Sequence, residues 1–206
     1  MIDHLSGIMV RGEFKDSLKK ALSAEETLTL GMLDIDQFME INDQAGEEVG
    51  DRLLTLLAET LREGAAANGW SVGRIGGDEF ALAMPGVSLE KGFLQMEALR
   101  MDLVRRAAAE FPEFQPTFSI GVANFPRDAK DVTALMRQAD HALYQVKEAG
   151  RNAVGLPTRE EMVLRSCYYN TAQLGRLKKL AEQVKKKESV LLREALDDLL
   201  RKYDVK

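Results

Sequence analysis

The feature that most constrains the fold is a pair of short apolar segments joined by a glycine-rich turn. Residues 71–75 and 80–84 each have the length of a β-strand, and Gly76 and Gly77 supply the backbone freedom of a tight turn. The pattern predicts a β-hairpin with Asp78 and Glu79 at its bend. Because hairpin strands are antiparallel, it favours a mixed α+β domain over a doubly wound parallel sheet.

The remaining periodicities supply the other elements of such a domain. Residues 27–35 and 117–123 are apolar, rich in β-favouring residues and too short for typical helices, so they are predicted to be buried strands. Apolar residues at helical spacing predict helices over 11–22, 50–61, 88–111 and 131–148, with a break at 64–69. We therefore expect a central, mostly antiparallel sheet flanked by helices.

Charge divides the chain near Pro157. Residues 1–157 carry 16 basic and 25 acidic side chains, whereas 158–206 carry 12 and 8, so the net charges are −9 and +4. This break predicts a domain over 1–156 and a C-terminal region over 157–206. A basic region attached to an acidic domain indicates a polyanionic partner such as DNA, or else a solvated helical face.

The chain lacks the sequence signals of a membrane or secreted protein. Its apolar runs, such as residues 80–84, are far shorter than the roughly 18 residues of a membrane span, and no basic segment precedes an apolar stretch at the N-terminus. We expect no membrane partner and a cytoplasmic location. With one cysteine, Cys167, and two histidines, a zinc cluster is excluded and any metal must bind oxygen.

Two carboxylates are expected to meet at the end of the sheet. Asp34 closes a predicted strand and Asp78 lies on the hairpin bend. Facing carboxylates need a shared proton or a cation, and Mg²⁺ takes one or two carboxylates together with water and phosphate oxygens. The pair therefore indicates phosphoryl or nucleotidyl transfer, although turn chemistry alone also places Asp at such sites.

The sequence of residues 76–80, Gly-Gly-Asp-Glu-Phe, is the signature of the GGDEF family of diguanylate cyclases. Five further segments resemble motifs of that family in the same order: Asp3 with 5–8 and Arg11, residues 34–43, Gly46 with Gly50 and Asp51, residues 119–122, and residues 139–152. The resemblance spans residues 3–154. It implies a helix-flanked sheet akin to the nucleotide-cyclase and polymerase palm.

The resemblance also implies residue roles. Asp34, the main-chain carbonyl of Ile35 and Asp78 would ligate two Mg²⁺ ions per active site, with Mn²⁺ as an alternative, and Glu79 would assist metal binding or activate the 3′-hydroxyl. Asp34, Asp78 and Glu79 form the catalytic set. The residues implied to hold the triphosphate of GTP are Gln37, Phe38, Met39, Lys147 and Arg151. Asn42 and Asp51 would read guanine, and their alternative role is helix capping.

The activity implied is the condensation of two GTP molecules into cyclic di-GMP, with release of two pyrophosphates, by a homodimer in bacterial signalling. Met39 replaces a lysine of the family and Glu47 a histidine, which predicts weaker triphosphate binding. Ala67 and Trp70 occupy the Arg and Asp positions of the product-inhibition site, so that inhibition is expected to be absent. The alternative function is a non-catalytic, DNA-binding transcriptional regulator that senses GTP or cyclic di-GMP.

The C-terminal region is predicted to contain a β-favouring patch at 167–169 and two amphipathic helices, over 171–185 and from a cap at Ser189. This order resembles ribbon-helix-helix DNA-binding domains, which are dimers. The DNA contacts implied are Arg165, Ser166, Tyr168, Asn170, Lys186 and Lys187. The alternative is a helical hairpin that dimerises without touching DNA. Either form would supply the homodimer.

Overall fold

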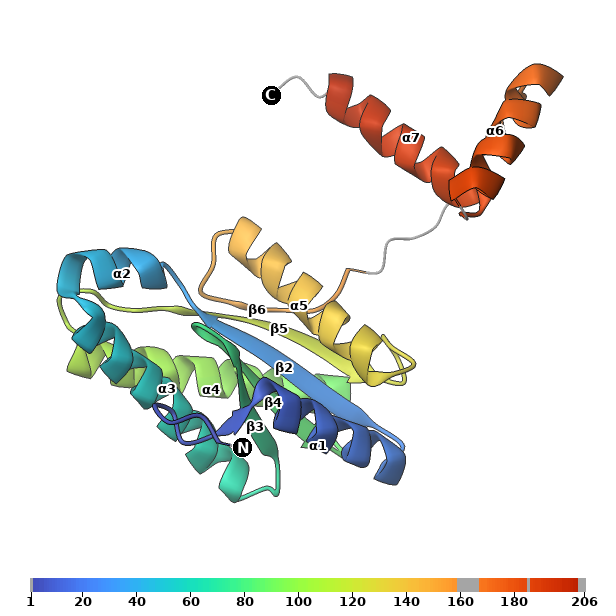
Figure 1. Cartoon of the computed structure of the whole chain (residues 1–206). Coiled ribbons are helices and arrows are strands. Elements are labelled where there is room, and N and C mark those ends of the chain that lie inside the picture. The colour runs from blue at the N-terminus through green and yellow to red at the C-terminus, as the bar shows by residue number, and fades with distance from the viewer. Residues whose placement is uncertain (1, 159–166, 185, 204–206) are drawn as a thin grey trace. The chain divides into compact units, whose positions relative to one another are not determined.

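The computed structural model describes residues 2–158, 167–184 and 186–203. The chain divides into two compact units, Met1–Arg159, here called the body, and Glu160–Lys206, called the tail (Figure 1). The body contains, in order, β1 (Met9–Val10), α1 (Arg11–Ala24), β2 (Leu28–Ile35), α2 (Phe38–Ala45), α3 (Glu47–Ala66), β3 (Ser71–Gly76), β4 (Glu79–Pro85), α4 (Leu89–Glu110), β5 (Phe118–Phe125), α5 (Val132–Glu148) and β6 (Val154–Gly155).

The strands of the body form one sheet in the order β1-β3-β4-β2-β5-β6. The four central strands pair antiparallel, whereas the two-residue edge strands β1 and β6 pair parallel with β3 and β5. This topology confirms the expected α+β class and the mostly antiparallel sheet. It also places β2 between β4 and β5, so the end of β2 lies beside the β3–β4 turn.

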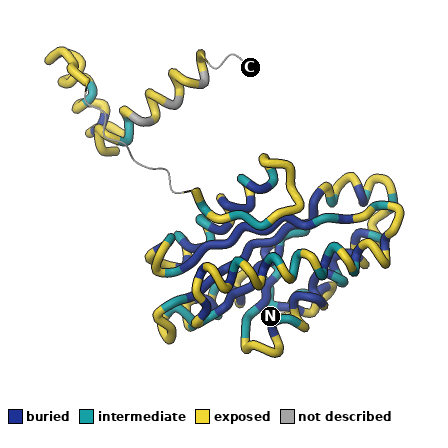
Figure 2. Tube along the Cα trace, turned by 180° about the vertical axis from the view of Figure 1, so that it is seen from behind, coloured by how far each residue is buried: buried dark blue, intermediate teal, exposed yellow. Residues whose placement is uncertain are grey.

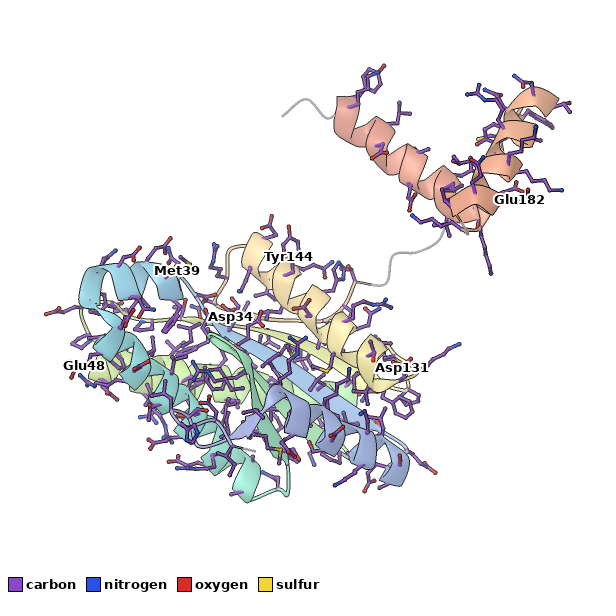
Figure 3. All side chains as sticks on the ribbon, viewed as in Figure 1. Asp34, Met39, Glu48, Asp131, Tyr144 and Glu182 are labelled. Carbon is purple, nitrogen blue, oxygen red and sulfur yellow. The ribbon has the colours of Figure 1, made fainter. Side chains whose placement is uncertain are left out.

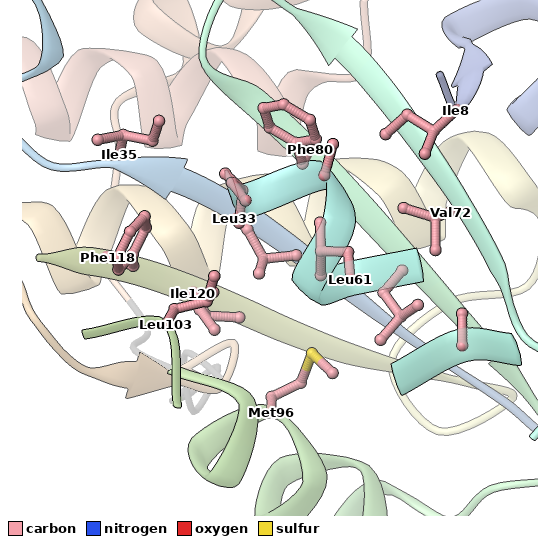
Figure 4. Packing of buried hydrophobic residues seen from close by; sticks show 14 of the residues in the cluster. Ile8, Leu33, Ile35, Leu61, Val72, Phe80, Met96, Leu103, Phe118 and Ile120 are labelled. Atoms are coloured by element: carbon pink, nitrogen blue, oxygen red, sulfur yellow. The ribbon is translucent and has the colours of Figure 1, made fainter. Parts of the chain in front are cut away.

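Two hydrophobic clusters, one on each face of the sheet, arrange the body in three layers. One cluster joins α3 and α4 to strand residues that include Leu33, Phe80 and Ile120 (Figure 4). The other joins α1 and α5 to the alternate strand positions, such as Met32 and Ala81. The strands between them are almost wholly buried, as Figure 2 shows.

The contact between α5 and the sheet is unusually close at Gly121 of β5. A Cβ atom at this position would lie 2.1 Å from the carbonyl oxygen of Ala139 and 2.2 Å from the nitrogen of Leu143. Both are backbone atoms of α5, so the helix lies directly on the strand. Glycine at position 121 therefore sets how near the residues of α5 come to β2 and β5.

The predicted strands and long helices are confirmed, with shifts of up to two residues at their ends, except in α3. This helix begins at Glu47 and ends at Ala66, so the break expected over 64–69 is present but starts after Ala66, and Gly64 itself lies within the helix. Leu61 and Ala65 are buried in the core beside Gly64. Their burial outweighs the cost of about 1 kcal/mol for an interior helical glycine.

The tail consists of two amphipathic helices, α6 (Thr171–Val184) and α7 (Glu188–Tyr203). The expected helix cap at Ser189 is wrong, because α7 already begins at Glu188 and Ser189 lies within it. Residues 167–170 form no strand in the structure, so the expected β-patch is not seen there. Tyr168, Asn170, Lys186 and Lys187 are exposed, while Arg165 and Ser166 lie outside the described residues.

Candidate functional site

The sheet places Asp34 among the residues expected to do chemistry. Asp34, next to last in β2, is opposite Glu79 of β4 on one side and Ser119 of β5 on the other. Asp34 and Glu79 share the parity of Met32 and Ala81, so both belong to the face covered by α1 and α5. Asp34 is only 4% exposed (Figure 3).

The surroundings of Asp34 strongly shift its pKa. The Nζ of Lys147, in the last turn of α5, lies 2.6 Å from Asp34 Oδ2. Burial nevertheless raises the pKa of Asp34 to about 6; the hydrogen bond from Lys147 opposes this rise, while the negative charges of Asp78 and Glu79 add to it. The negative charge of Asp78 therefore contributes to the electrostatics of Asp34, and the sharing of a metal ion by these two carboxylates stays a prediction.

The turn that carries Asp78 is braced by Arg74, a residue that the sequence motifs did not single out. The Arg74 Nε donates a hydrogen bond of 2.8 Å to the carbonyl oxygen of Gly77, and its Nη1 lies 3.1 Å from Asp3 Oδ1. Asp3 also accepts hydrogen bonds from the amide and hydroxyl of Ser6. An arginine in an otherwise apolar strand was the available signal for this brace.

Asp36 is a second carboxylate with an identified structural role. It is 4% exposed and accepts hydrogen bonds from Thr117 Oγ1 at 2.7 Å, Ser119 Oγ at 2.6 Å and the amide of Asn152 at 3.1 Å. Its lone pairs are thus used within the body. These bonds tie the end of β2 to β5 and to the segment that follows α5, where Arg151 lies.

The expected phosphate-binding residues lie near Asp34 in the chain and at the end of α5. Gln37 precedes α2 in a left-handed conformation, with φ of 57°, and its side chain does not cap the helix, so Gln37 supplies no side-chain acceptor to the first amides. Phe38 is half-buried and Met39 is 78% exposed (Figure 3). Arg151 is exposed, whereas Lys147 is engaged with Asp34.

Asn42 contains an unpaired buried atom. Its Oδ1 has no hydrogen-bond partner within the described part of the chain. Gly50 of α3 faces this atom, and a Cβ at position 50 would lie 1.9 Å from it. Asn42 lies inside α2 and Asp51 inside α3, so the alternative that they cap helices is wrong. Buried polar atoms without a partner are uncommon in folded proteins, and a role in binding is one explanation for such an atom.

Glu47, and the pair Ala67 and Trp70, depart from the family pattern and lie in different surroundings. Glu47 is exposed in the first turn of α3 and lines a surface pocket with Glu48 and Asp51, so this region is acidic. Ala67 and Trp70 line another pocket, between α3 and α4, and neither supplies a charge there.

The donors at the end of β2 suit a hard cation. The carboxylates of Asp34 and Asp78 are oxygen donors, and Lys147 already places a positive charge against Asp34. Across the residues that the structure describes, no group of three or more His, Cys, Asp or Glu side chains is arranged to hold a metal ion. Water and phosphate oxygens would therefore have to complete the coordination.

Among the described helices, none is long and apolar enough to cross a membrane.

Comparisons with known proteins agree with this geometry. The chain matches the family model "Diguanylate cyclase, GGDEF domain" over residues 1–153 and the ribbon-helix-helix domain over 165–204. Diguanylate cyclase DgcM of Escherichia coli is 33% identical over 156 residues, 74% of this chain and 37% of that protein. YhcK of Bacillus subtilis, an uncharacterized protein, is 33% identical over 171 residues, 77% of this chain and 46% of that protein.

Solved structures agree as well. The GGDEF domain of DgcB from Caulobacter crescentus, in complex with cyclic di-GMP, superposes with a TM-score of 0.68 at 30% identity, over 75% of this chain and 94% of that one. The active GGEEF domain of a diguanylate cyclase from Vibrio cholerae gives 0.66 at 27% identity, over 74% and 99%. The chain spans less than half the length of the two curated relatives named above. By its family match, its fold and its ordered motifs, the chain belongs to the GGDEF diguanylate cyclase domain family.

Proposed function

We propose that the protein is a diguanylate cyclase that joins two GTP molecules into cyclic di-GMP and releases two pyrophosphates. The observation that carries this proposal is the buried carboxylate of Asp34, which lies opposite Glu79, interacts with Asp78 and is paired with Lys147. Such a set of acidic and basic groups fits binding of a metal-bound triphosphate.

Each residue has a distinct task in this reaction. Asp34, Asp78 and the carbonyl of Ile35 would hold two Mg²⁺ ions, which would supply charge stabilisation on the α-phosphate. The 3′-oxygen of each GTP forms a bond to the α-phosphorus of the other as the bond from that phosphorus to pyrophosphate breaks, so that two bonds form and two pyrophosphates leave. Glu79 either accepts the hydroxyl proton or supports the metal ions.

The remaining residues bind the nucleotide. The first amides of α2, at Phe38 and Met39 after Gln37, and the cations Lys147 and Arg151 hold the triphosphate. Asn42 and Asp51 read guanine, and the unpaired Oδ1 of Asn42 supports this role. A carboxylate at position 51 accepts from the guanine N1–H, which adenine lacks, so adenine would leave polar groups unpaired.

The tail is proposed to hold two copies of the chain together. Its helices expose large apolar side chains that two short helices cannot bury alone: Leu174, Leu180, Val184, Leu192, Leu196, Leu199 and Leu200. A homodimer would cover them and would also give the cyclase the two GTP-binding bodies it requires. Exposed Lys186 and Lys187, with Tyr168, Asn170 and the undescribed Arg165 and Ser166, are the proposed DNA contacts.

The test of catalysis uses the full-length protein with GTP and Mg²⁺. We expect wild type to produce pyrophosphate and cyclic di-GMP, and Asp78→Ala to produce neither. Lys130→Ala is a matched control, because Lys130 is an exposed surface residue with no described contact to the site. Equal activity of wild type and Asp78→Ala would refute the assignment.

A second candidate is a regulator that binds GTP or cyclic di-GMP without turnover. Met39 and Glu47, which replace a cation and a histidine of the family, favour it. Inactivity of wild type together with retained GTP binding would establish this candidate.

DNA binding is tested by a gel shift at two salt concentrations, because phosphate contacts weaken as salt rises. Lys186→Glu with Lys187→Glu should weaken the shift, whereas Lys130→Glu should not.

A further inference from the structure

Lys147 occupies the position of a cation on Asp34. Its Nζ lies 2.6 Å from Asp34 Oδ2, a distance typical of a charge-assisted hydrogen bond. The Asp34 side chain is 5% exposed and that of Lys147 is 32% exposed. Within the described part of the chain, Lys147 is the only cation in ion-pair contact with Asp34. It balances a carboxylate that Asp78 and Glu79 would otherwise surround with negative charge alone.

The backbone that carries Lys147 is firmly fixed, so any change in this pair must come from the side chain. Backbone atoms of α5 lie against Gly121 of β5. Just after the helix, the amide of Arg151 donates to the carbonyl of Val146 at 2.9 Å, and the amide of Asn152 donates to Asp36 Oδ2 at 3.1 Å. The four-carbon stem of the lysine is flexible and partly exposed, whereas the short side chain of Asp34 is enclosed.

The observed contact conflicts with the two tasks assigned above. Under the proposed function, Asp34 ligates a divalent ion and Lys147 holds the triphosphate. An ammonium group against Oδ2 takes the place of an incoming cation and, at the same time, has its charge neutralised before any phosphate arrives. Neither task can be performed fully while the pair remains intact.

We propose that Lys147 is an exchangeable counterion, which neutralises Asp34 while no metal is bound and transfers to the triphosphate when a divalent ion occupies the carboxylate. Metal and triphosphate then assist each other, because each removes the partner that competes with the other. The metal without triphosphate, and the triphosphate without metal, must each bind more weakly than the two bind together. The proposal rests on the site assigned under the proposed function, but it concerns binding and requires no turnover.

The first test measures Mn²⁺ binding to the full-length protein without nucleotide, from the electron paramagnetic resonance signal of unbound Mn²⁺. We expect Lys147→Met to bind Mn²⁺ about tenfold more tightly than wild type, or better, because one competing positive charge has been removed next to a buried ligand. Lys130→Met is the matched control. It removes an exposed lysine with no described contact to the site, and its Mn²⁺ affinity should equal that of wild type.

Lys147→Gln guards against a folding defect in the first variant, and the fluorescence of Trp70, the single tryptophan of the chain, reports whether each variant is folded. If the folded variants at position 147 bind Mn²⁺ no more tightly than wild type, the proposal is overturned. The same holds if Lys130→Met gains as much affinity as they do, since the effect would then be one of net charge.

The second test follows the lysine itself in wild type. Labelling by an amine-reactive reagent, quantified at each lysine by mass spectrometry, should rise at Lys147 when Mn²⁺ is added and stay constant at exposed Lys130. Unchanged labelling of Lys147 at saturating Mn²⁺ would overturn the exchange. Neither test depends on cyclic di-GMP. An inactive protein that passes both would disprove the proposed catalysis alone, and an active protein that fails both would disprove the exchange alone.

Discussion

The close approach of α5 to β5 makes a sharp prediction about one methyl group. In Gly121→Ala the new Cβ would lie 2.1 Å from the Ala139 carbonyl oxygen and 2.2 Å from the Leu143 nitrogen. Since ordinary contact begins at 3.4 Å, α5 must move by about 1.3 Å, the difference between 2.1 Å and 3.4 Å. Because both neighbours are backbone atoms, no side-chain rotation can relieve the overlap.

Overpacking of this kind costs about 3 kcal/mol or more, the upper end of the range for inserted methyl groups. For a domain of this size, that corresponds to a melting temperature lowered by roughly 6 to 12 °C. Gly12→Ala is the matched control. Gly12 lies in the first turn of α1, and a Cβ added there would meet no atom within 4 Å, so the same substitution should stabilise the body by up to about 1 kcal/mol.

The assay is urea and thermal unfolding followed by tryptophan fluorescence. Trp70 is the single tryptophan and lies in the body, so its signal reports the unfolding of that unit and not of the tail. Equal unfolding midpoints for Gly121→Ala and wild type would refute the argument. A loss of stability in Gly12→Ala as large as that in Gly121→Ala would show that glycine replacement is harmful in general.

Three further predictions concern the site. Burial first of all, and then the negative charges of Asp78 and Glu79, raise the pKa of Asp34 from an unfolded value of 3.8 to about 6 in the folded state. The folded state therefore binds this proton more tightly than the unfolded chain does, and the free energy of unfolding falls as pH rises from about 4 to 6. Asp34→Asn should remove this fall. It should increase the free energy of unfolding, measured with urea at pH 7.5 in EDTA, by about 1 to 3 kcal/mol, and a lower free energy of unfolding would contradict the prediction. Asp36→Ala leaves the buried hydroxyl of Ser119 without its acceptor and should lower the free energy of unfolding, measured with urea, by about 3 kcal/mol. Asp36→Asn should lower it by less than half as much. Equal losses in the two variants would refute the role of the Asp36 hydrogen bonds. Met39→Lys places a cation at the start of α2 and should tighten GTP binding by about threefold to tenfold in calorimetry, which unchanged affinity would disprove.

Much of the sheet was predictable because its signals are local. The hairpin around Gly76 and Gly77 and the apolar strand that ends at Asp34 depend on residues adjacent in sequence, and both are confirmed. The edge strands β1 and β6 were not predicted, because two residues show no periodicity. Gly64 within α3 was a misleading signal, since burial of Leu61 and Ala65 in the core outweighed the low helix propensity of glycine.

The order of the motifs in the sequence alone was enough to identify the family and to name Asp34, Asp78 and Lys147 as site residues. Only the tertiary structure revealed that Lys147 pairs with Asp34, that Arg74 braces the β3–β4 turn through Gly77, and that Asn42 has an unpaired buried oxygen. The Lys147–Asp34 pair joins segments far apart in the chain, whereas the Arg74–Gly77 hydrogen bond and the contact of Asn42 with Gly50 depend on how nearby side chains are placed in space. A residue pattern states which side chains are present, whereas the close packing of α5 on β5 and of α2 on α3 decides which of them meet.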